Sequence, residues 1–199
     1  MPDRPDSDLT PERAEQVFKA LEEQLRASGA AFELVVIGGS ALQALGLIDR
    51  ATRDVDVVAL AHEEGLVPAE PLPDVLVAAA HRVARDFGLP EDWLNAGPSD
   101  LVRLGMPVGF LGRVTTRRLG ASLTVHFASR YDQIHFKLYA MVDQGAGRHE
   151  IDLRALDPDP EELLAAARWA RTHDPSRGFL SELLAVLSYL GIDHADIGT

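Results

Sequence analysis

One stretch, residues 34–60, constrains the fold of this chain more than any other. It contains, in order, an apolar run, a Gly-Gly-Ser turn, a short helical segment and a second apolar run that carries two aspartates. Short β-branched runs next to glycine predict buried strands. We therefore expect a strand at 33–37, a helix at roughly 40–47 and a second strand at 54–60.

The two aspartates of this stretch, Asp54 and Asp56, are two residues apart. An extended backbone points both side chains to one face, while Val55 and Val57 point into the core. Neighbouring carboxylates repel each other unless a cation lies between them, and Mg²⁺ is usually held by one or two carboxylates together with substrate phosphates. The pattern therefore predicts a site for Mg²⁺ or Mn²⁺ at Asp54 and Asp56.

The turn Gly38-Gly39-Ser40 predicts a binding site for the phosphates of a nucleotide. Ser40 suits the N-cap of the following helix, whose first backbone N–H groups can bind an anion. Glycine lets the backbone come close to a ligand because it has no Cβ. A tight turn that only needs positive φ explains the same residues, and solvated carboxylates at a strand edge explain the aspartates.

Gly39-Ser40 followed by Asp54-Val55-Asp56 resembles the signature of the nucleotidyltransferase superfamily with the DNA polymerase β-type palm. That signature is a strand, a Gly-Gly or Gly-Ser turn, a helix and a strand with Asp-x-Asp. The resemblance implies an α/β (α+β) fold, in which a palm with a small mixed sheet is flanked by helices and followed by a C-terminal helical part. The superfamily usually adds a third carboxylate from a later strand, but this chain has His126 in the predicted strand 123–128.

The second half of the chain carries a narrower resemblance. Lys137 falls on the apolar stripe of a predicted helix at 131–142, where a lysine must extend its head to solvent, pair with an acid or meet a ligand. With Asp152 downstream, the chain resembles the nucleotidyltransferases of abortive-infection and toxin–antitoxin systems, in which a later aspartate opens another helix. That branch usually carries Arg-x-Lys-Asp before its final Asp-Leu, whereas this chain has the residues 148–152, RHEID, with Glu150 as the candidate first acid.

The resemblance implies a metal-dependent enzyme that moves an NMP from an NTP to an acceptor hydroxyl of RNA, protein or a small molecule. Asp54, Asp56, Lys137 and Asp152 would be catalytic, and Lys137 would also bind the nucleotide with the Gly-Gly-Ser turn. A toxin-type enzyme with an antitoxin or other protein partner is one such interpretation. The alternative is a catalytically degenerate member of the fold that acts as a binding or partner module.

Composition limits these functions. A net charge of −12 over 199 residues argues against nonspecific binding to nucleic acid, for which a basic footprint is expected. The chain has no cysteine and no apolar run as long as a membrane span, so we expect a cytoplasmic protein without a membrane partner. We expect a nucleotidyltransferase-like domain at 10–157 and a C-terminal helical subdomain at 158–199 packed on it.

The remaining segments predict the ends of the chain and its further helices. Residues 1–9 are rich in proline and aspartate and predict disorder. The basic stretch 113–118, RVTTRR, is typical of a solvated loop, although it would also suit a polyanionic substrate. Trp93 is expected to be a core anchor. Further helices are predicted at 11–28, 73–87, 160–171 and 177–190, whereas 100–121 remains unassigned.

Overall fold

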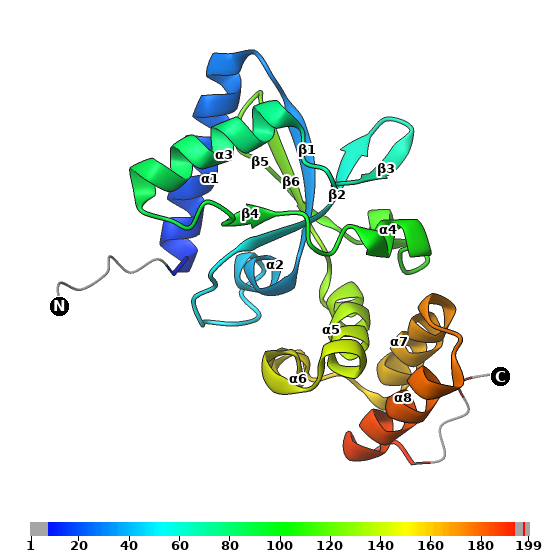
Figure 1. The fold of residues 1–199 in the computed structure, drawn as a ribbon. Helices are drawn as coiled ribbons and strands as arrows, with labels where there is room; N and C mark the ends of the chain where they lie inside the picture. The colour runs from blue at the N-terminus through cyan, green and yellow to red at the C-terminus, as the bar shows by residue number, and fades with distance from the viewer. Residues whose placement is uncertain (1–7, 194–196, 198–199) are drawn as a thin grey trace. The chain divides into compact units, whose positions relative to one another are not determined.

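The computed structural model describes residues 8–193 and residue 197. The chain divides into two compact units, which Figure 1 shows in ribbon form. The sheet unit comprises residues up to 103 together with 113–128, and the helical unit comprises 104–112 together with the residues from 129 onward. The backbone therefore passes between the units three times, at 103/104, 112/113 and 128/129. The predicted domain boundary after residue 157 stays a prediction.

The sheet unit contains one mixed sheet with the strand order β3-β2-β1-β6-β5, and β4 also pairs with β2. Strand β1 pairs antiparallel with β2 and parallel with β6, which in turn pairs antiparallel with β5. The strand bounds are β1 Phe32–Ile37, β2 Val55–His62, β3 Gly65–Pro68, β4 Leu94–Asn95, β5 Thr115–Arg118 and β6 Leu123–Phe127. The predicted fold class, a small mixed sheet flanked by helices with a helical C-terminal part, is confirmed.

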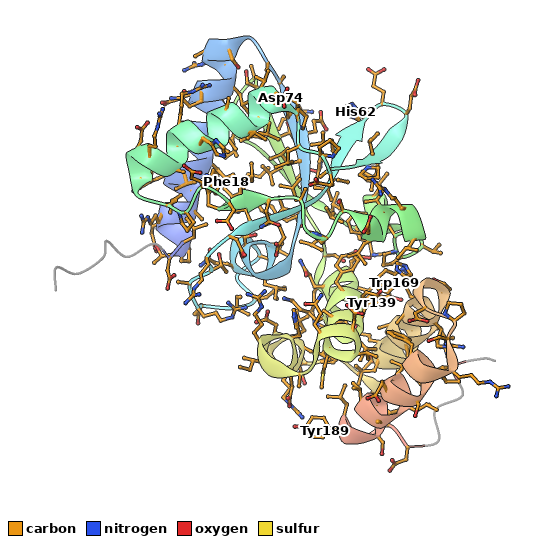
Figure 2. The ribbon with its side chains drawn as sticks, viewed as in Figure 1. Phe18, His62, Asp74, Tyr139, Trp169 and Tyr189 are labelled. Carbon is orange, nitrogen blue, oxygen red and sulfur yellow. The ribbon has the colours of Figure 1, made fainter. Side chains whose placement is uncertain are left out.

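Two long helices, α1 (Pro11–Ser28) and α3 (Asp74–Phe87), pack against each other over the sheet (Figure 1). Helix α1 begins as the sequence predicts, because the Thr10 side chain accepts a hydrogen bond from the backbone N–H of Arg13 and proline occupies the first turn. Phe18 of α1, labelled in Figure 2, contacts Phe127 of β6 edge to face at 6.3 Å between ring centroids. These contacts form the core on one face of the sheet.

The structure corrects the expectation of disorder at Leu9. Residues 1–7 of that segment lie outside the described residues. Leu9, however, forms a β-bridge with Thr52, with backbone N···O distances of 2.6 and 3.0 Å. Its side chain is only 1 % exposed and belongs to the core, so burial of one leucine fixes the chain just before α1.

The segment left unassigned by the sequence forms three short elements: α4 (Asp100–Leu104), η1 (Phe110–Gly112) and β5. The basic stretch 113–118 is therefore not a loop, because its last four residues form the exposed edge strand β5. Exposed cationic side chains on an edge strand discourage pairing with another chain, which accounts for this sequence without a polyanionic ligand.

The helical unit contains α5 (Arg130–Gln144), α6 (Gly147–Ala155), α7 (Pro160–His173) and α8 (Arg177–Tyr189). Trp169 of α7 packs against Tyr139 of α5, with ring centroids 6.0 Å apart, and both are labelled in Figure 2. The carbonyl oxygen of Gly105 accepts hydrogen bonds from Trp169 Nε1 at 3.0 Å and His173 Nε2 at 2.9 Å. These bonds attach the segment 104–112 to α7. Within residues 8–193, no helix combines the length and the hydrophobicity that crossing a lipid bilayer requires.

Candidate active site

The turn after β1 lies directly against Asp56. Helix α2 (Gly38–Ala44) follows β1 without a linker, and the last residue of β1, Ile37, pairs with Asp56 across the sheet. Gly38 has φ +75°, and a Cβ at this position would stand 2.5 Å from Asp56 Oδ2. Glycine is thus required twice, once for the backbone conformation and once for the space that the carboxylate occupies.

The burial of Asp54 to Val57 alternates, as in the predicted strand. Val55 and Val57 are fully buried, whereas both aspartates are half-buried. Strand β2 begins at Val55, so Asp54 immediately precedes it. The predicted strand 54–60 is therefore shifted by one residue at its start and extends to His62. The Asp56 carboxylate lies at the start of β2 next to the Gly38 turn, and Asp54 is two residues before it in the chain.

Two buried hydroxyl groups flank the same turn. Ser40 is not the N-cap of α2, because the helix begins at Gly38 and Ser40 is its third residue. Ser40 Oγ and Thr52 Oγ1 are both buried and have no hydrogen-bond partner in the structure. Thr52 lies beside Gly39, where a Cβ would meet Thr52 Cγ2 at 2.8 Å. Buried hydroxyls without a partner are costly, so these two oxygens mark a local strain beside the turn.

The residue that sequence reasoning missed is Asn95, on the two-residue strand β4. Strand β4 pairs in parallel with β2, and Asn95 stands beside Asp56 in that register. Asn95 Nδ2 donates a hydrogen bond of 3.2 Å to Asp56 Oδ1, while the backbone N–H of Gly97 donates to Asn95 Oδ1 at 2.9 Å. The sequence feature that could have pointed to Asn95 is Trp93, a predicted core anchor two residues earlier. Trp93 is fully buried and fixes the position of this segment.

His126, the residue in the position expected for a third acid, does not adjoin the aspartates. It lies on β6, which is separated from β2 by β1. Its two ring nitrogens contact Thr116 Oγ1 at 2.8 Å and Glu33 Oε2 at 2.9 Å. The Glu33 carboxylate can only accept, so Nε2 donates to it, while Nδ1 shares a hydrogen bond with the Thr116 hydroxyl. These partners fully engage the imidazole.

Lys137 and Asp152 form a buried ion pair within the helical unit. Lys137 Nζ of α5 lies 2.7 Å from Asp152 Oδ2 of α6, and their side chains are 8 % and 1 % exposed. Asp152 is the sixth residue of α6 and does not open that helix. Glu150 faces elsewhere, because it accepts hydrogen bonds from Arg154 Nε and Tyr189 Oη, each at 2.8 Å. That Lys137 and Asp152 act on a nucleotide held by Asp54 and Asp56 stays a prediction.

His149 lies close to this ion pair. Burial lowers the pKa of His149 below its ordinary 6.5, and the positive charges of Lys137 and Arg148 lower it further against the opposing charge of Asp152. The folded protein therefore favours the neutral imidazole of His149 more than the unfolded chain does. Between the lowered pKa and 6.5, the unfolded chain binds a proton that the folded chain does not.

We expect the free energy of unfolding of H149Q to fall less with decreasing pH than that of the wild type. In the wild type, the free energy of unfolding should fall as the pH drops from 6.5 through the lowered pKa of His149. Urea unfolding at pH 7.5 and pH 5.5 measures this difference. H81Q, at an exposed histidine of α3, is the control and should keep the wild-type slope. An equal slope in H149Q and H81Q would contradict the assignment. Burial also lowers the pKa of His173, so part of the slope should remain.

The substitution G38A tests the contact between the turn and Asp56. We expect it to destabilise the fold by about 1–3 kcal/mol, because alanine at positive φ is strained and its Cβ displaces the carboxylate. Gly46 offers a matched control, since it has φ +68° and no atom lies within 4 Å of the place that a Cβ would occupy. Urea unfolding should therefore show a larger loss for G38A than for G46A. Equal losses would mean that Asp56 moves freely out of the way.

The residues at this site fit a divalent cation that is shared with a substrate. Among residues 8–193 and 197, no group of three or more His, Cys, Asp or Glu side chains could hold a metal ion. The carboxylates of Asp54 and Asp56 are hard oxygen ligands of the kind that Mg²⁺ and Mn²⁺ prefer, and they would hold such an ion if it bound here. A two-carboxylate set leaves most coordination positions for substrate phosphates and water.

A comparison with protein families matches residues 12–148 to a family described as "Nucleotidyltransferase of unknown function (DUF6036)". The matched region contains the Gly38 turn, both aspartates, Asn95 and Lys137, and it ends before Asp152. No curated protein and no solved structure matches the chain. Because the match covers more than half of the 199 residues, this chain belongs to that nucleotidyltransferase family.

Proposed function

We propose that this protein is a metal-dependent nucleotidyltransferase that moves an NMP from an NTP to an acceptor hydroxyl. One observation carries the proposal: in a chain of a nucleotidyltransferase family, the Gly38 turn lies against the carboxylate of an Asp-x-Asp strand. A close-approaching backbone beside two carboxylates is the arrangement that a triphosphate with its magnesium ion needs.

Asp54 and Asp56 would hold Mg²⁺ or Mn²⁺, which supplies positive charge to the phosphates of the NTP. The backbone at Gly38 and Gly39 and the hydroxyl of Ser40 would bind the β- and γ-phosphates. In the reaction, the acceptor oxygen bonds to the α-phosphorus while the bond from that phosphorus to the bridging oxygen breaks, and pyrophosphate leaves.

Lys137 and Asp152 would act together, as their direct contact suggests. Lys137 would add a point charge to the triphosphate. Asp152 would either join the metal ligands, directly or through water, or accept the proton of the acceptor hydroxyl as a general base. In each case the ligand would replace part of the contact between the two side chains.

The acceptor in this proposal is an RNA or protein hydroxyl, and a toxin-type enzyme with an antitoxin partner is the biological setting that we favour. The net charge of −12 supports a protein acceptor or partner at least as well as an RNA. An RNA acceptor would need a local basic surface, and the exposed strand β5 carries two arginines, Arg117 and Arg118.

The test is transfer of label from NTPs. The purified protein is incubated with Mg²⁺ or Mn²⁺, each of the four NTPs labelled at the α-phosphate, and total RNA or cell protein as the acceptor. We expect label on one acceptor class or on the protein itself. The same NTPs labelled at the γ-phosphate should transfer nothing, because that phosphate leaves in pyrophosphate. Transfer of the γ-label alone, or of neither label together with no NTP binding by calorimetry, would contradict the proposal.

The alternative, a degenerate member that binds a partner, is favoured by the lack of a third acid beside Asp54 and Asp56 among the described residues. The melting temperature separates the two. An increase that requires metal and NTP together supports the enzyme, because a ligand that binds only the folded state stabilises it. If metal and NTP leave the melting temperature unchanged, the partner module is supported.

A further inference from the structure

Asn95 takes the place beside Asp56 that a third acid would need. In the parallel pair of β4 and β2, Val55 pairs with Leu94 and Asp56 with Asn95. Residues side by side on neighbouring strands have Cβ atoms roughly 5 Å apart, so a carboxylate at Asn95 could share a cation with Asp56. His126 cannot do so, because β1 lies between its strand and β2. The neighbouring strand thus supplies an amide where an acid would fit.

The orientation of this amide is fixed. Gly97 N–H can only donate, so the Asn95 atom that it contacts at 2.9 Å is the oxygen. The NH₂ group then faces Asp56 Oδ1 at 3.2 Å. With the reverse orientation, two donors would face each other at Gly97 and two acceptors would face each other at Asp56. Asn95 therefore donates to Asp56, and its oxygen is engaged by the backbone.

The backbone around Asn95 holds this geometry. The Trp93 side chain is fully buried, and its Nε1 donates to the carbonyl oxygen of Ala80 at 3.0 Å. Trp93 O accepts from Val55 N at 2.6 Å, which joins the start of β2 to the residue before β4. Asn95 is the only asparagine in the 199 residues. The Asn95 NH₂ group is thus carried on a short strand that is held in place by the buried Trp93 and by the start of β2.

We infer that Asn95 is a positioning residue that orients Asp56 and keeps this site at two carboxylates, so that the cation binds together with the nucleotide and only weakly without it. This inference rests on the proposed function. One neutral donor in place of a carboxylate removes a ligand and a negative charge from the cation. The phosphates of the NTP then have to supply the missing ligand and the missing negative charge. Asn95 would in this way couple metal binding to nucleotide binding.

The test is a calorimetric titration of Mn²⁺ without nucleotide into the wild type, N95D and H126D. We expect N95D to bind Mn²⁺ at least about tenfold more tightly than the wild type, because a third carboxylate joins the other two. H126D adds the same charge at the position that the sequence suggested, and we expect it to bind no more tightly than the wild type. The gain in N95D should vanish in N95D combined with D54N.

Two results would overturn the inference. One is an affinity of N95D for Mn²⁺ no higher than that of the wild type, and the other is a gain in H126D as large as the gain in N95D. Because no nucleotide is present, these results do not depend on whether transfer is detected, so they are distinct from failure of the proposed function.

A second variant, N95A, keeps the inference testable if N95D does not fold. It remains neutral but no longer donates to Asp56, so we expect unchanged weak binding of Mn²⁺ alone. Its affinity for NTP in the presence of Mn²⁺ should fall at least about fivefold, consistent with the loss of a hydrogen bond to a charged group. A merely structural asparagine would lower the melting temperature of N95A without changing this affinity, and that outcome would also refute a positioning role.

Discussion

Replacing both Asp54 and Asp56 with asparagine should lower nucleotidyl transfer by at least about a thousandfold, or about 4 kcal/mol of transition-state stabilisation. Asparagine has nearly the shape of aspartate but carries no negative charge, so the cation that neutralises the phosphates would lose its anchor. The measurement is the initial rate of α-label transfer under the conditions that give label with the wild type. Asp49→Asn, at an exposed position in the loop before β2, should keep the wild-type rate.

The same double variant should not be destabilised without metal. Two half-buried carboxylates two residues apart in the chain repel each other, and their neutralisation relieves that repulsion. We expect the free energy of unfolding to stay within about 1 kcal/mol of the wild type or to rise. Lost activity in a stable protein would assign the aspartates to chemistry. Lost activity with a large drop in stability would instead mean that Asp54 and Asp56 are structural, and full activity would remove them from the mechanism.

The start of the site could be predicted from the sequence because its pattern is local. An apolar run, Gly38-Gly39 and a second apolar run with two aspartates lie within 27 residues, and each part follows from strand alternation or from turn chemistry. The structure places Gly38 against Asp56 through the pairing of Ile37 with Asp56. Strands β1 and β2 are close in sequence and pair with each other, so the apolar alternation of each strand is enough to indicate their contact.

Asn95 could not be predicted in the same way. Its strand is two residues long, far too short for an alternating pattern, and it pairs with a strand 39 residues earlier. Parallel pairing of such a short segment depends on tertiary contacts, here the burial of Trp93. The sequence therefore pointed to His126, whose strand is regular and easily recognised but is not a neighbour of β2.

Helix ends were predictable where a capping side chain marks them. Thr10 caps α1, and Asp159 forms a capping box with Glu162 at the start of α7. Helix α6 has no side-chain cap, and its N-cap residue is Ala146. Nothing local therefore indicated that the helix begins five residues before Asp152, and the sequence placed Asp152 at a helix start instead of inside one.

The ion pair of Lys137 with Asp152 is buried in the helical unit. We expect K137M to lower the free energy of unfolding by about 3–5 kcal/mol, because it leaves the Asp152 carboxylate, 1 % exposed, charged and without its cation. Domains of this size are stable by only about 5–15 kcal/mol, so the loss would be a large fraction of the total. Urea unfolding measures it. Lys19, the only other lysine of the chain, pairs with Glu15 at 2.6 Å with both side chains more than half exposed. K19M should therefore cost less than about 1 kcal/mol.

The double variant K137M/D152L then separates structure from chemistry. Replacing a buried ion pair with two apolar side chains of similar volume is often neutral for stability, so we expect most of the loss in K137M to be recovered. If the pair is only structural, nucleotidyl transfer returns with the stability. If Lys137 contacts the triphosphate and Asp152 assists the acceptor, the double variant folds with near wild-type stability and still transfers at least about a hundredfold more slowly. Recovery of both properties would leave Asp54 and Asp56 as the catalytic residues, with Asn95 as the positioning residue beside Asp56.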